Sequence, residues 1–206
     1  MAESESLFHP IVKLPDEYWV FDFTKPAREA WQCPFDYQIG RYDEHRPGMY
    51  TTEIFGGERD LHVGLDIGAP VGTGVYAFAD GTVYSMGTNP EPGSYGPTII
   101  TEHMVSLPKS VGSNELSPAG KIWVLHGHLS TESLDFLQVG DEISAGQKIA
   151  AIGNDKENGG WPPHIHIQLA LQPPPKNDLP GVVKLSDRDT ALRQYPDPRL
   201  IVGQVY

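Results

Sequence analysis

The sequence has little cysteine, few cations and no long apolar run, and each shortage excludes a class of protein. One cysteine, Cys33, cannot form an internal disulfide, so the fold must be stable without one. Lys and Arg number 15 against 27 Asp and Glu, which gives a net charge of −12. Nucleic acid and anionic membranes attract basic surfaces, so neither is expected as the main partner. No stretch approaches the roughly 20 apolar residues of a transmembrane helix.

The amino-terminal stretch MAESESLFHPIVKLP has neither the basic region nor the apolar region of a signal peptide. As written, the chain is therefore expected to be cytoplasmic, and exported only if its amino terminus has been trimmed.

The residues that are abundant indicate a loop-rich β protein. The chain has 206 residues, of which 39% are hydrophobic, and its 22 glycines and 19 prolines make up a fifth of it. Short apolar runs such as GVYAF, GPTII and KIWVL recur between turn-forming residues from about residue 60 onwards. Runs of this kind, rich in β-branched and aromatic residues, predict an all-β fold of mainly antiparallel strands with a few short helices and long loops.

The residue pattern of the sequence changes near residue 55 and again near residue 172, which predicts three parts. Residues 1–55 are expected to form an irregular arm with one or two short strands, packed on the core. Residues 56–172 form the central β domain. Residues 173–206 begin with a Pro-rich connector and end in a short helix and a tail docked on the core. The arm is expected to dock through four aromatic residues: Trp19, Phe21, Phe23 and Trp31.

Local signals predict several smaller features. Asp80-Gly81 lies between two strand-like runs and predicts a hairpin turn. Val105–Gly120 has turn formers and no period, which predicts a surface loop that is a lid, a binding loop or disordered. Helices are expected at Thr131–Leu137, capped by Ser130 or Thr131, and at Ser186–Gln194, capped by Ser186.

The histidines indicate the chemistry. Six of the eight fall between residues 62 and 166, and four of these form two pairs, His126-Gly-His128 and His164-Ile-His166. Alternate residues of a strand point to the same face about 6.6 Å apart, so each pair can contribute to a single site. The isolated His9 is expected to be an ordinary surface or core histidine, and so is His45.

A further histidine lies four residues before an aspartate, in His62-Val-Gly-Leu-Asp66. In a flat strand their Cα atoms would lie about 13 Å apart, too far for both side chains to reach one metal ion. Joint coordination therefore requires a bend, and Gly64 is where a bend costs least. The spacing alone is also compatible with a chance His and Asp at the end of a strand.

Imidazole nitrogens and a carboxylate oxygen are donors that suit zinc. Structural zinc sites usually have four ligands that include cysteines, and a single cysteine disfavours that type. A catalytic zinc has three protein ligands and an open position. His62, Asp66 and one later histidine would leave spare imidazoles beside the metal, and these could move protons during hydrolysis.

Four segments in order, HVGLDIGAPVGTGVYAFADGTV, LHGHLS, VGDEISAGQKIAAIG and GGWPPHIHIQ, resemble the lysostaphin-type (LytM-like) zinc metallopeptidases. The resemblance covers roughly residues 60–170 and identifies the 56–172 part as a zinc metallopeptidase domain. NGGWPPH and the tail DLPG…YPDPRLIVG are most similar to peptidase-like domains attached to aminotransferases. The implied substrates are peptidoglycan-type peptides, cut at glycyl or D-alanyl bonds.

The resemblance also implies residue roles. It implies one Zn²⁺ per chain and two catalytic imidazoles, His128 and His164, which activate water and stabilise the tetrahedral oxyanion. Val105–Gly120 and Gly159–Pro163 are expected to wall a substrate groove. The implied metal ligands are His62, Asp66 and His166.

Three further residues are expected at the edge of this site or behind its ligands. His126 stands where the family often has Tyr, and Trp161 is either a substrate platform or simply packed in its loop. Gln168 stands where many relatives carry an acidic residue.

Other functions are compatible with parts of the sequence. The main alternative is a non-catalytic peptide-binding or regulatory module on the same fold. VGDEISAGQKIAAIG also resembles biotinyl or lipoyl carrier domains, but Lys148 lies in a strand-like run and not at a turn. A phosphocarrier would use paired histidines without a metal, so zinc content discriminates it from a peptidase.

Overall fold

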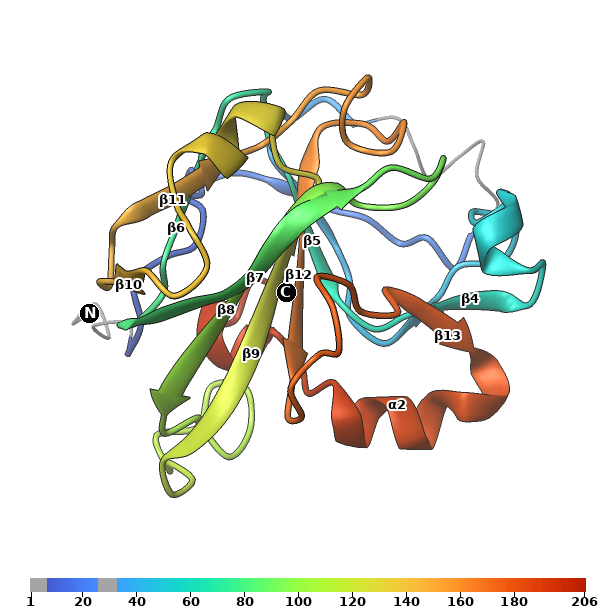
Figure 1. Cartoon of the computed structure of the whole chain (residues 1–206). Coiled ribbons are helices and arrows are strands. Elements are labelled where there is room, and N and C mark those ends of the chain that lie inside the picture. Colours follow the sequence, from blue (N-terminus) through green and yellow to red (C-terminus); the bar gives the residue numbers. More distant parts are fainter. Residues whose placement is uncertain (1–6, 26–32) are drawn as a thin grey trace.

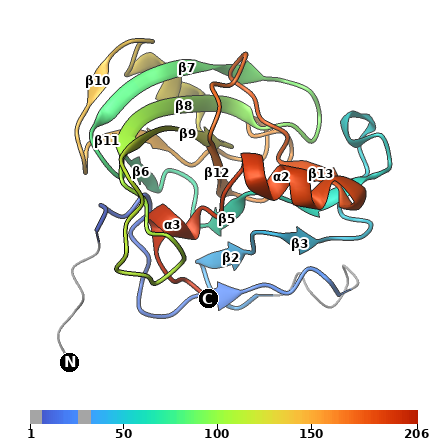
Figure 2. The same ribbon diagram turned by 90° about the horizontal axis from the view of Figure 1, so that it is seen from below.

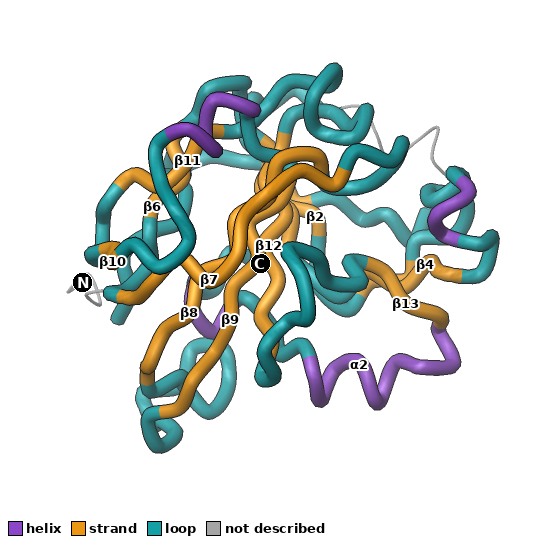
Figure 3. The backbone as a smooth tube through the Cα atoms, in the orientation of Figure 1, coloured by secondary structure: helices purple, strands orange, loops and turns teal. Residues whose placement is uncertain are grey.

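The computed structural model describes residues 7–25 and 33–206. It is built mainly of β-strands, and Figure 3 shows that the helical turns among the described residues are few and short. The dominant element is an eight-stranded sheet in the order β1-β2-β5-β12-β9-β8-β7-β10. All of its pairings are antiparallel except β1 with β2. The prediction of a mainly antiparallel all-β fold is confirmed.

The strands of the main sheet are β1 (Trp19–Val20), β2 (Gln38–Gly40), β5 (Leu65–Gly68), β7 (Gly81–Asn89), β8 (Gly96–Val105), β9 (Gly120–Gly127), β10 (Glu142–Ile143) and β12 (His164–Ala170). Two smaller sheets flank it (Figure 1). They consist of β6 (Gly74–Tyr76) with β11 (Lys148–Ala151), and of β3 (Glu44–His45), β4 (Arg59–His62) and β13 (Val182–Lys184). The α-helices are α2 (Arg188–Gln194) and α3 (Arg199–Val202), and 3-10 turns occur at Glu53–Phe55, Thr131–Asp135 and Leu185–Asp187.

The central strands β8, β9 and β12 are buried on both faces over most of their length, and the polar residues of β12, His164, His166 and Gln168, share one face. One face packs on the main core, to which Ile99, Val124 and Ile167 contribute. The other face carries a smaller cluster around Ile100 and Leu125. Each fully buried aliphatic side chain of this kind contributes roughly 1.5–3 kcal/mol of transfer free energy. The sheet is therefore a rigid base for the polar residues that lie on its second face.

The amino-terminal segment is part of the same body. β2 pairs with β5, and β3 pairs with β4, so residues 38–45 lie beside the start of the central domain (Figure 2). Trp19 stacks on Phe35 with ring centroids 6.2 Å apart, and Phe21 stacks on Phe23. Trp31, predicted as a docking residue, lies outside the described residues.

The prediction of a hairpin turn at Asp80-Gly81 was wrong. Asp80-Gly81 does not join a hairpin, because the strand before it, β6, pairs with β11, whereas β7 pairs with β8 and β10. The turn signal was real, but it redirects the chain from one sheet to another. The helix predicted at Ser186–Gln194 is confirmed, although it begins as a 3-10 turn, becomes α-helical at Arg188 and is not capped by Ser186.

The segment predicted as a helix at Thr131–Leu137 is a single 3-10 turn, Thr131–Asp135, and Ser130 precedes it without a side-chain cap bond. No helix in the described part of the chain is long and apolar enough to cross a membrane.

Candidate metal centre

The chain changes sheets between His62 and Asp66. β4 ends at His62 in the three-stranded sheet, and β5 begins at Leu65 in the main sheet. The bend brings His62 Nε2 to 3.2 Å from Asp66 Oδ1, so the bend that joint coordination requires is present. Gly64 is not in the left-handed region. Its role is steric, because a Cβ atom there would lie 2.3 Å from His166 Cε1.

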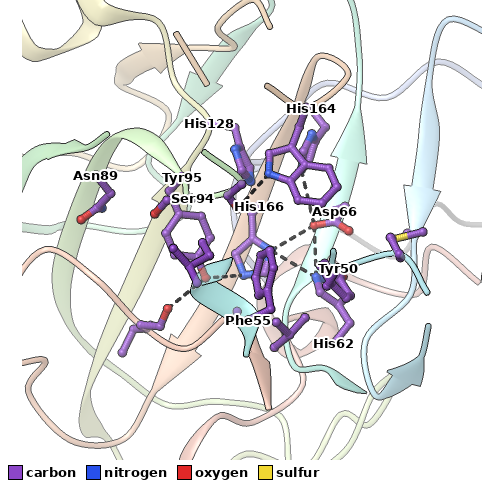
Figure 4. Close-up of a pocket in the computed structure, with 18 of the residues that line it drawn as sticks. Tyr50, Phe55, His62, Asp66, Asn89, Ser94, Tyr95, His128, His164 and His166 are labelled. Carbon is purple, nitrogen blue, oxygen red and sulfur yellow. Dashed lines mark hydrogen bonds and ion pairs between the residues drawn. The ribbon is translucent and has the colours of Figure 1, made fainter. Parts of the chain in front are cut away.

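His166 completes the cluster from the neighbouring strand. It lies directly opposite Asp66 in the β5–β12 register, which puts the two side chains on the same face of the sheet. His166 Nδ1 is 3.0 Å from Asp66 Oδ1 and 3.1 Å from His62 Nε2. The three donor atoms lie within 4.8 Å of one another, as a shared metal ion requires (Figure 4).

The remaining polar atoms of these three side chains have partners, which orients the donor atoms. His62 Nδ1 donates to the Arg41 carbonyl oxygen at 2.8 Å, and His166 Nε2 lies 3.3 Å from Gln168 Oε1. A proton on each of these nitrogens leaves a lone pair on the ring nitrogen that faces the cluster. Bonds of this kind fix the tautomer and direction of metal-binding imidazoles.

The electrostatics of the site favour the protonation states that a metal needs. Burial by itself raises the pKa of Asp66, but attraction to His62 and to the Arg46 guanidinium outweighs it and holds that pKa well below its usual range. Burial lowers the pKa of His62 to about 4. An ionised carboxylate beside a neutral imidazole is the donor set that divalent cations bind. The residues therefore fit a zinc ion.

His128 and His164 lie beside the cluster. His164 Nδ1 donates to the Pro162 carbonyl at 2.7 Å, and its Nε2 is 3.9 Å from Asp66 Oδ1. His128 Nδ1 donates to the Asn158 carbonyl at 2.8 Å. Burial lowers the pKa of both histidines, so both rings are neutral near pH 7. The two Nε2 atoms remain available for proton transfer.

His126 and His128 do not share a face. β9 ends at Gly127, and His128 adopts a φ of 62°, a left-handed conformation that is uncommon outside glycine. His126 is in register with Ile167 and therefore faces the main core, where its Nδ1 lies 3.3 Å from the Ile99 carbonyl oxygen. The alternation rule failed here because the strand stops between the two histidines. His126 lies on the opposite face of the sheet from the cluster.

The cluster opens into a cavity of about 1260 Å³. Part of its wall is the predicted Gly159–Pro163 segment, through Gly160, Trp161, Pro162 and Pro163. Trp161 Nε1 donates to the Gly93 carbonyl at 3.0 Å and so links two walls. No residue of Val105–Gly120 lines this cavity, so the prediction that this loop walls the groove was wrong. The other walls come from the amino-terminal segment and from the stretches 88–95 and 175–182.

Several residues of the site have no signal in the sequence. The most important are Arg46, whose Nη1 donates to Asp66 Oδ2 at 2.8 Å, and Tyr95, whose hydroxyl is 3.4 Å from His166 Nε2. Asn158 holds the loop next to His128 by bonding Trp161 through its side chain. The contacts of Arg46 and Tyr95 join distant parts of the chain, so only the tertiary structure brings these residues to the cluster.

The fold and the site together define a β protein in which His, Asp and His donors are arranged for a catalytic metal ion. Residues 60–177 match the model of Peptidase family M23, and the chain belongs to that family. The resemblance to lysostaphin-type peptidases is thereby confirmed. The further likeness to domains attached to aminotransferases stays a prediction.

Comparison with curated proteins gives relatives that are much longer than this chain. The protein is 29% identical over 119 residues to "DD-carboxypeptidase/endopeptidase Mpg" of Neisseria meningitidis and of Neisseria gonorrhoeae. The match covers 58% of this chain and 22% of the relatives.

Solved structures with detectable similarity include a zinc-containing peptidase from Vibrio cholerae, at 26% identity, a TM-score of 0.43, and coverage of 64% of this chain and 32% of that one. The catalytic domain of the M23 protein EnpA from Enterococcus faecalis is 23% identical, with a TM-score of 0.45 and coverage of 75% of this chain and 91% of that one. The catalytic domain of lysostaphin from Staphylococcus simulans is 20% identical, with a TM-score of 0.44 and coverage of 75% of this chain and 92% of that one.

Proposed function

We propose that the protein is a zinc-dependent metalloendopeptidase that hydrolyses peptide bonds next to small residues, glycyl or D-alanyl, in peptidoglycan-type peptides. The observation that carries the proposal is the convergence of His62 Nε2, Asp66 Oδ1 and His166 Nδ1 beside two further neutral imidazoles. Membership of Peptidase family M23 supports the same reaction.

The type of metal follows from the donors. Two imidazole nitrogens and one carboxylate oxygen are characteristic of catalytic zinc, which keeps a fourth position open. Bound there, zinc would lower the pKa of a water molecule and polarise the carbonyl of the scissile bond. Among the described residues this is the one group of at least three His, Cys, Asp or Glu side chains with converging donor atoms, so one zinc per chain is proposed.

His128 and His164 supply the proton transfers. Each ring is fixed through Nδ1 to a main-chain carbonyl, so the opposite nitrogen, Nε2, is the one that can accept or donate a proton. One imidazole can take a proton from the attacking water on Nε2 and then pass that proton to the leaving amine, whereas the other can donate a hydrogen bond to the oxygen that becomes negative once its own Nε2 is protonated. The two rings are held 4.2 Å apart, close enough to act on one bond.

The names of the curated relatives and the cavity beside the cluster support the choice of substrate. The curated relatives carry names that specify DD-carboxypeptidase and endopeptidase activity. The cavity has a volume of about 1260 Å³, and the aromatic residues Tyr50, Phe55 and Trp161 line it together with the cluster. A cavity of this volume with aromatic walls can hold a peptide substrate.

The test is hydrolysis by zinc-loaded protein of pentaglycine, of a stem peptide ending in D-alanyl-D-alanine, and of a bulky control peptide of equal length. Products would be identified by mass spectrometry, with His62→Ala as the metal-binding variant and His9→Ala as the matched control. Cleavage of a small-residue peptide, lost in His62→Ala and kept in His9→Ala, is expected. Tight binding of a peptide without cleavage would instead support a peptide-binding module.

A further inference from the structure

A buried ion pair from the amino-terminal segment lies directly behind the candidate metal ligands. The Arg46 side chain is 3% exposed and the Glu44 side chain 4%. Arg46 donates through Nη1 to Asp66 Oδ2 at 2.8 Å and through Nε to Glu44 Oε2 at 2.9 Å. Glu44 is held in turn, because its Oε1 accepts from the Phe23 backbone N–H at 3.1 Å.

The same guanidinium also supports a second ligand. Arg46 Nη2 donates to the Arg41 carbonyl oxygen at 3.0 Å, and that oxygen is the acceptor for His62 Nδ1 at 2.8 Å. Arg46 therefore contacts one ligand, Asp66, directly and shares an acceptor atom with another. A planar guanidinium with several fixed donors can hold such groups in defined directions, which a lysine ammonium cannot do.

Local packing is consistent with this arrangement. The Arg46 guanidinium lies over the Phe23 ring, 4.8 Å from its centroid. A Cβ atom at position 40 would lie 2.8 Å from both Arg46 Nη2 and Asp66 Oδ2, so glycine leaves room for this contact. All of these supporting residues precede residue 60, where the match to the peptidase family begins.

We propose that Arg46, oriented by Glu44, is a positioning residue for the metal ligands Asp66 and His62. It fixes the Asp66 carboxylate so that Oδ1 faces the metal position, and through the Arg41 carbonyl it fixes the ring of His62. The functional unit then begins near residue 38, and the segment before residue 60 is part of the metal centre. This inference rests on the proposed zinc site.

If Arg46 and Glu44 only stabilised the fold, replacing both in a protein that still folds would leave zinc binding unchanged. Removing one partner of a buried ion pair leaves a lone buried charge and destabilises the fold, whereas removing both charges together is often tolerated. The double variant Glu44→Gln with Arg46→Gln should therefore stay folded but lose the orientation of Asp66. The matched control is Arg188→Gln, which removes an arginine from the exposed ion pair with Asp43.

The experiment measures zinc affinity of the metal-free, folded proteins by competition with a chromophoric chelator, together with the visible spectrum of the cobalt-substituted forms. Loss of contacts that orient metal ligands typically lowers metal affinity by roughly 10- to 100-fold. That loss is expected for Arg46→Gln and for the double variant, with a changed cobalt spectrum. Arg46→Lys keeps the charge and should lose affinity as well, and Arg188→Gln should match the native protein.

Zinc affinity within about twofold of native, or tighter, in the folded double variant would overturn the proposal. If the double variant fails to fold, native affinity in Arg46→Lys would overturn it and weakened affinity would support it. A native protein that binds no zinc defeats the proposed function as well as this inference, whereas equal affinity in native and variant proteins defeats the inference alone.

Discussion

The imidazole rings of His128 and His164 lie with their centroids 4.2 Å apart, although one follows strand β9 and the other begins strand β12. Each is anchored by Nδ1 to a main-chain carbonyl oxygen, from Asn158 and Pro162 respectively. Both rings are neutral and have free Nε2 atoms beside one set of metal donors, so each can accept a proton, and a ring that has accepted one can then donate it. The left-handed backbone at His128 is part of this arrangement, because it turns the ring away from the face on which His126 lies.

Replacing either of these histidines should remove turnover and leave the metal in place. His128→Ala and His164→Ala are each expected to lower kcat by at least about 100-fold, the lower end of what a general acid or base contributes. Zinc content, measured by inductively coupled plasma mass spectrometry, should stay at one per chain. His9→Ala is the control, because His9 contacts Tyr76 and does not line the cavity. Loss of zinc in either variant would assign that histidine to the metal.

Gly64 should tolerate no side chain. A Cβ atom there would lie 2.3 Å from His166 Cε1, so Gly64→Ala must displace the imidazole. The expected result is a loss of zinc affinity of at least about 10-fold, as for other changes that misorient a ligand. Gly120→Ala is the matched control, since its Cβ would meet no atom within 4 Å. Unchanged affinity in Gly64→Ala would show that His166 is not held at the position described.

His126 should make the metal-free protein less stable in acid. Burial lowers the pKa of His126 to about 4, against about 6.5 in an unfolded chain. Because the unfolded state binds the proton more tightly, the free energy of unfolding falls as the pH drops below 6.5, and the fall levels off near pH 4. Linkage gives a loss of about 2 kcal/mol between pH 7 and pH 5 from this residue.

Urea denaturation of metal-free native protein and of His126→Phe at both pH values measures that contribution. The variant should lose about 2 kcal/mol less than the native protein between pH 7 and pH 5. At pH 7 it should be no less stable, because it also removes His126 Nε2, a buried atom without a partner in the described residues. Equal losses in both proteins would mean that His126 titrates normally in the fold.

Trp161 should affect substrate binding more than the metal. Its ring lines the cavity 5.9 Å from the Tyr50 ring, and its Nε1 bonds to the Gly93 carbonyl. Trp161→Ala is expected to raise KM by roughly 10-fold, since loss of a large aromatic contact costs about 1–2 kcal/mol. Trp161→Phe keeps a ring but loses the bond to Gly93 and should be intermediate. Steady-state kinetics measures KM, and thermal unfolding measures stability. A native KM in both variants, together with a lower unfolding temperature, would show that Trp161 has only a structural role.

His62 and Asp66 could be singled out from a short sequence motif and His166 from the family resemblance; the structure brings the three together, and their role as zinc ligands stays a prediction. His62 and Asp66 lie four residues apart around Gly64. In a flat strand their side chains could not reach one metal ion, so the prediction required a bend, and the structure contains it. The prediction for His128 and His164 as catalytic imidazoles stays a prediction, although the structure places both rings beside the cluster. The antiparallel β architecture followed from short apolar runs separated by turn formers.

Features that depend on tertiary context could not be predicted. The face to which His126 points depends on the residue at which β9 ends, and alternation carries no information about that. The Asp80-Gly81 turn was visible, but the pairing partners of the strands on either side depend on the whole sheet. Arg46 and Asp66 are 20 residues apart in the sequence, and nothing in the local sequence indicates that Arg46 is buried.

The measurement that tests the central claim most directly is a titration of metal-free protein with zinc, in which bound zinc and peptide hydrolysis are followed together. The account predicts that hydrolysis is absent without zinc, rises with occupancy and saturates at one zinc per chain. The same titration of Asp66→Asn should show weaker binding and little hydrolysis. Hydrolysis in the absence of zinc, or native zinc binding in Asp66→Asn, would contradict a metal centre built from His62, Asp66 and His166.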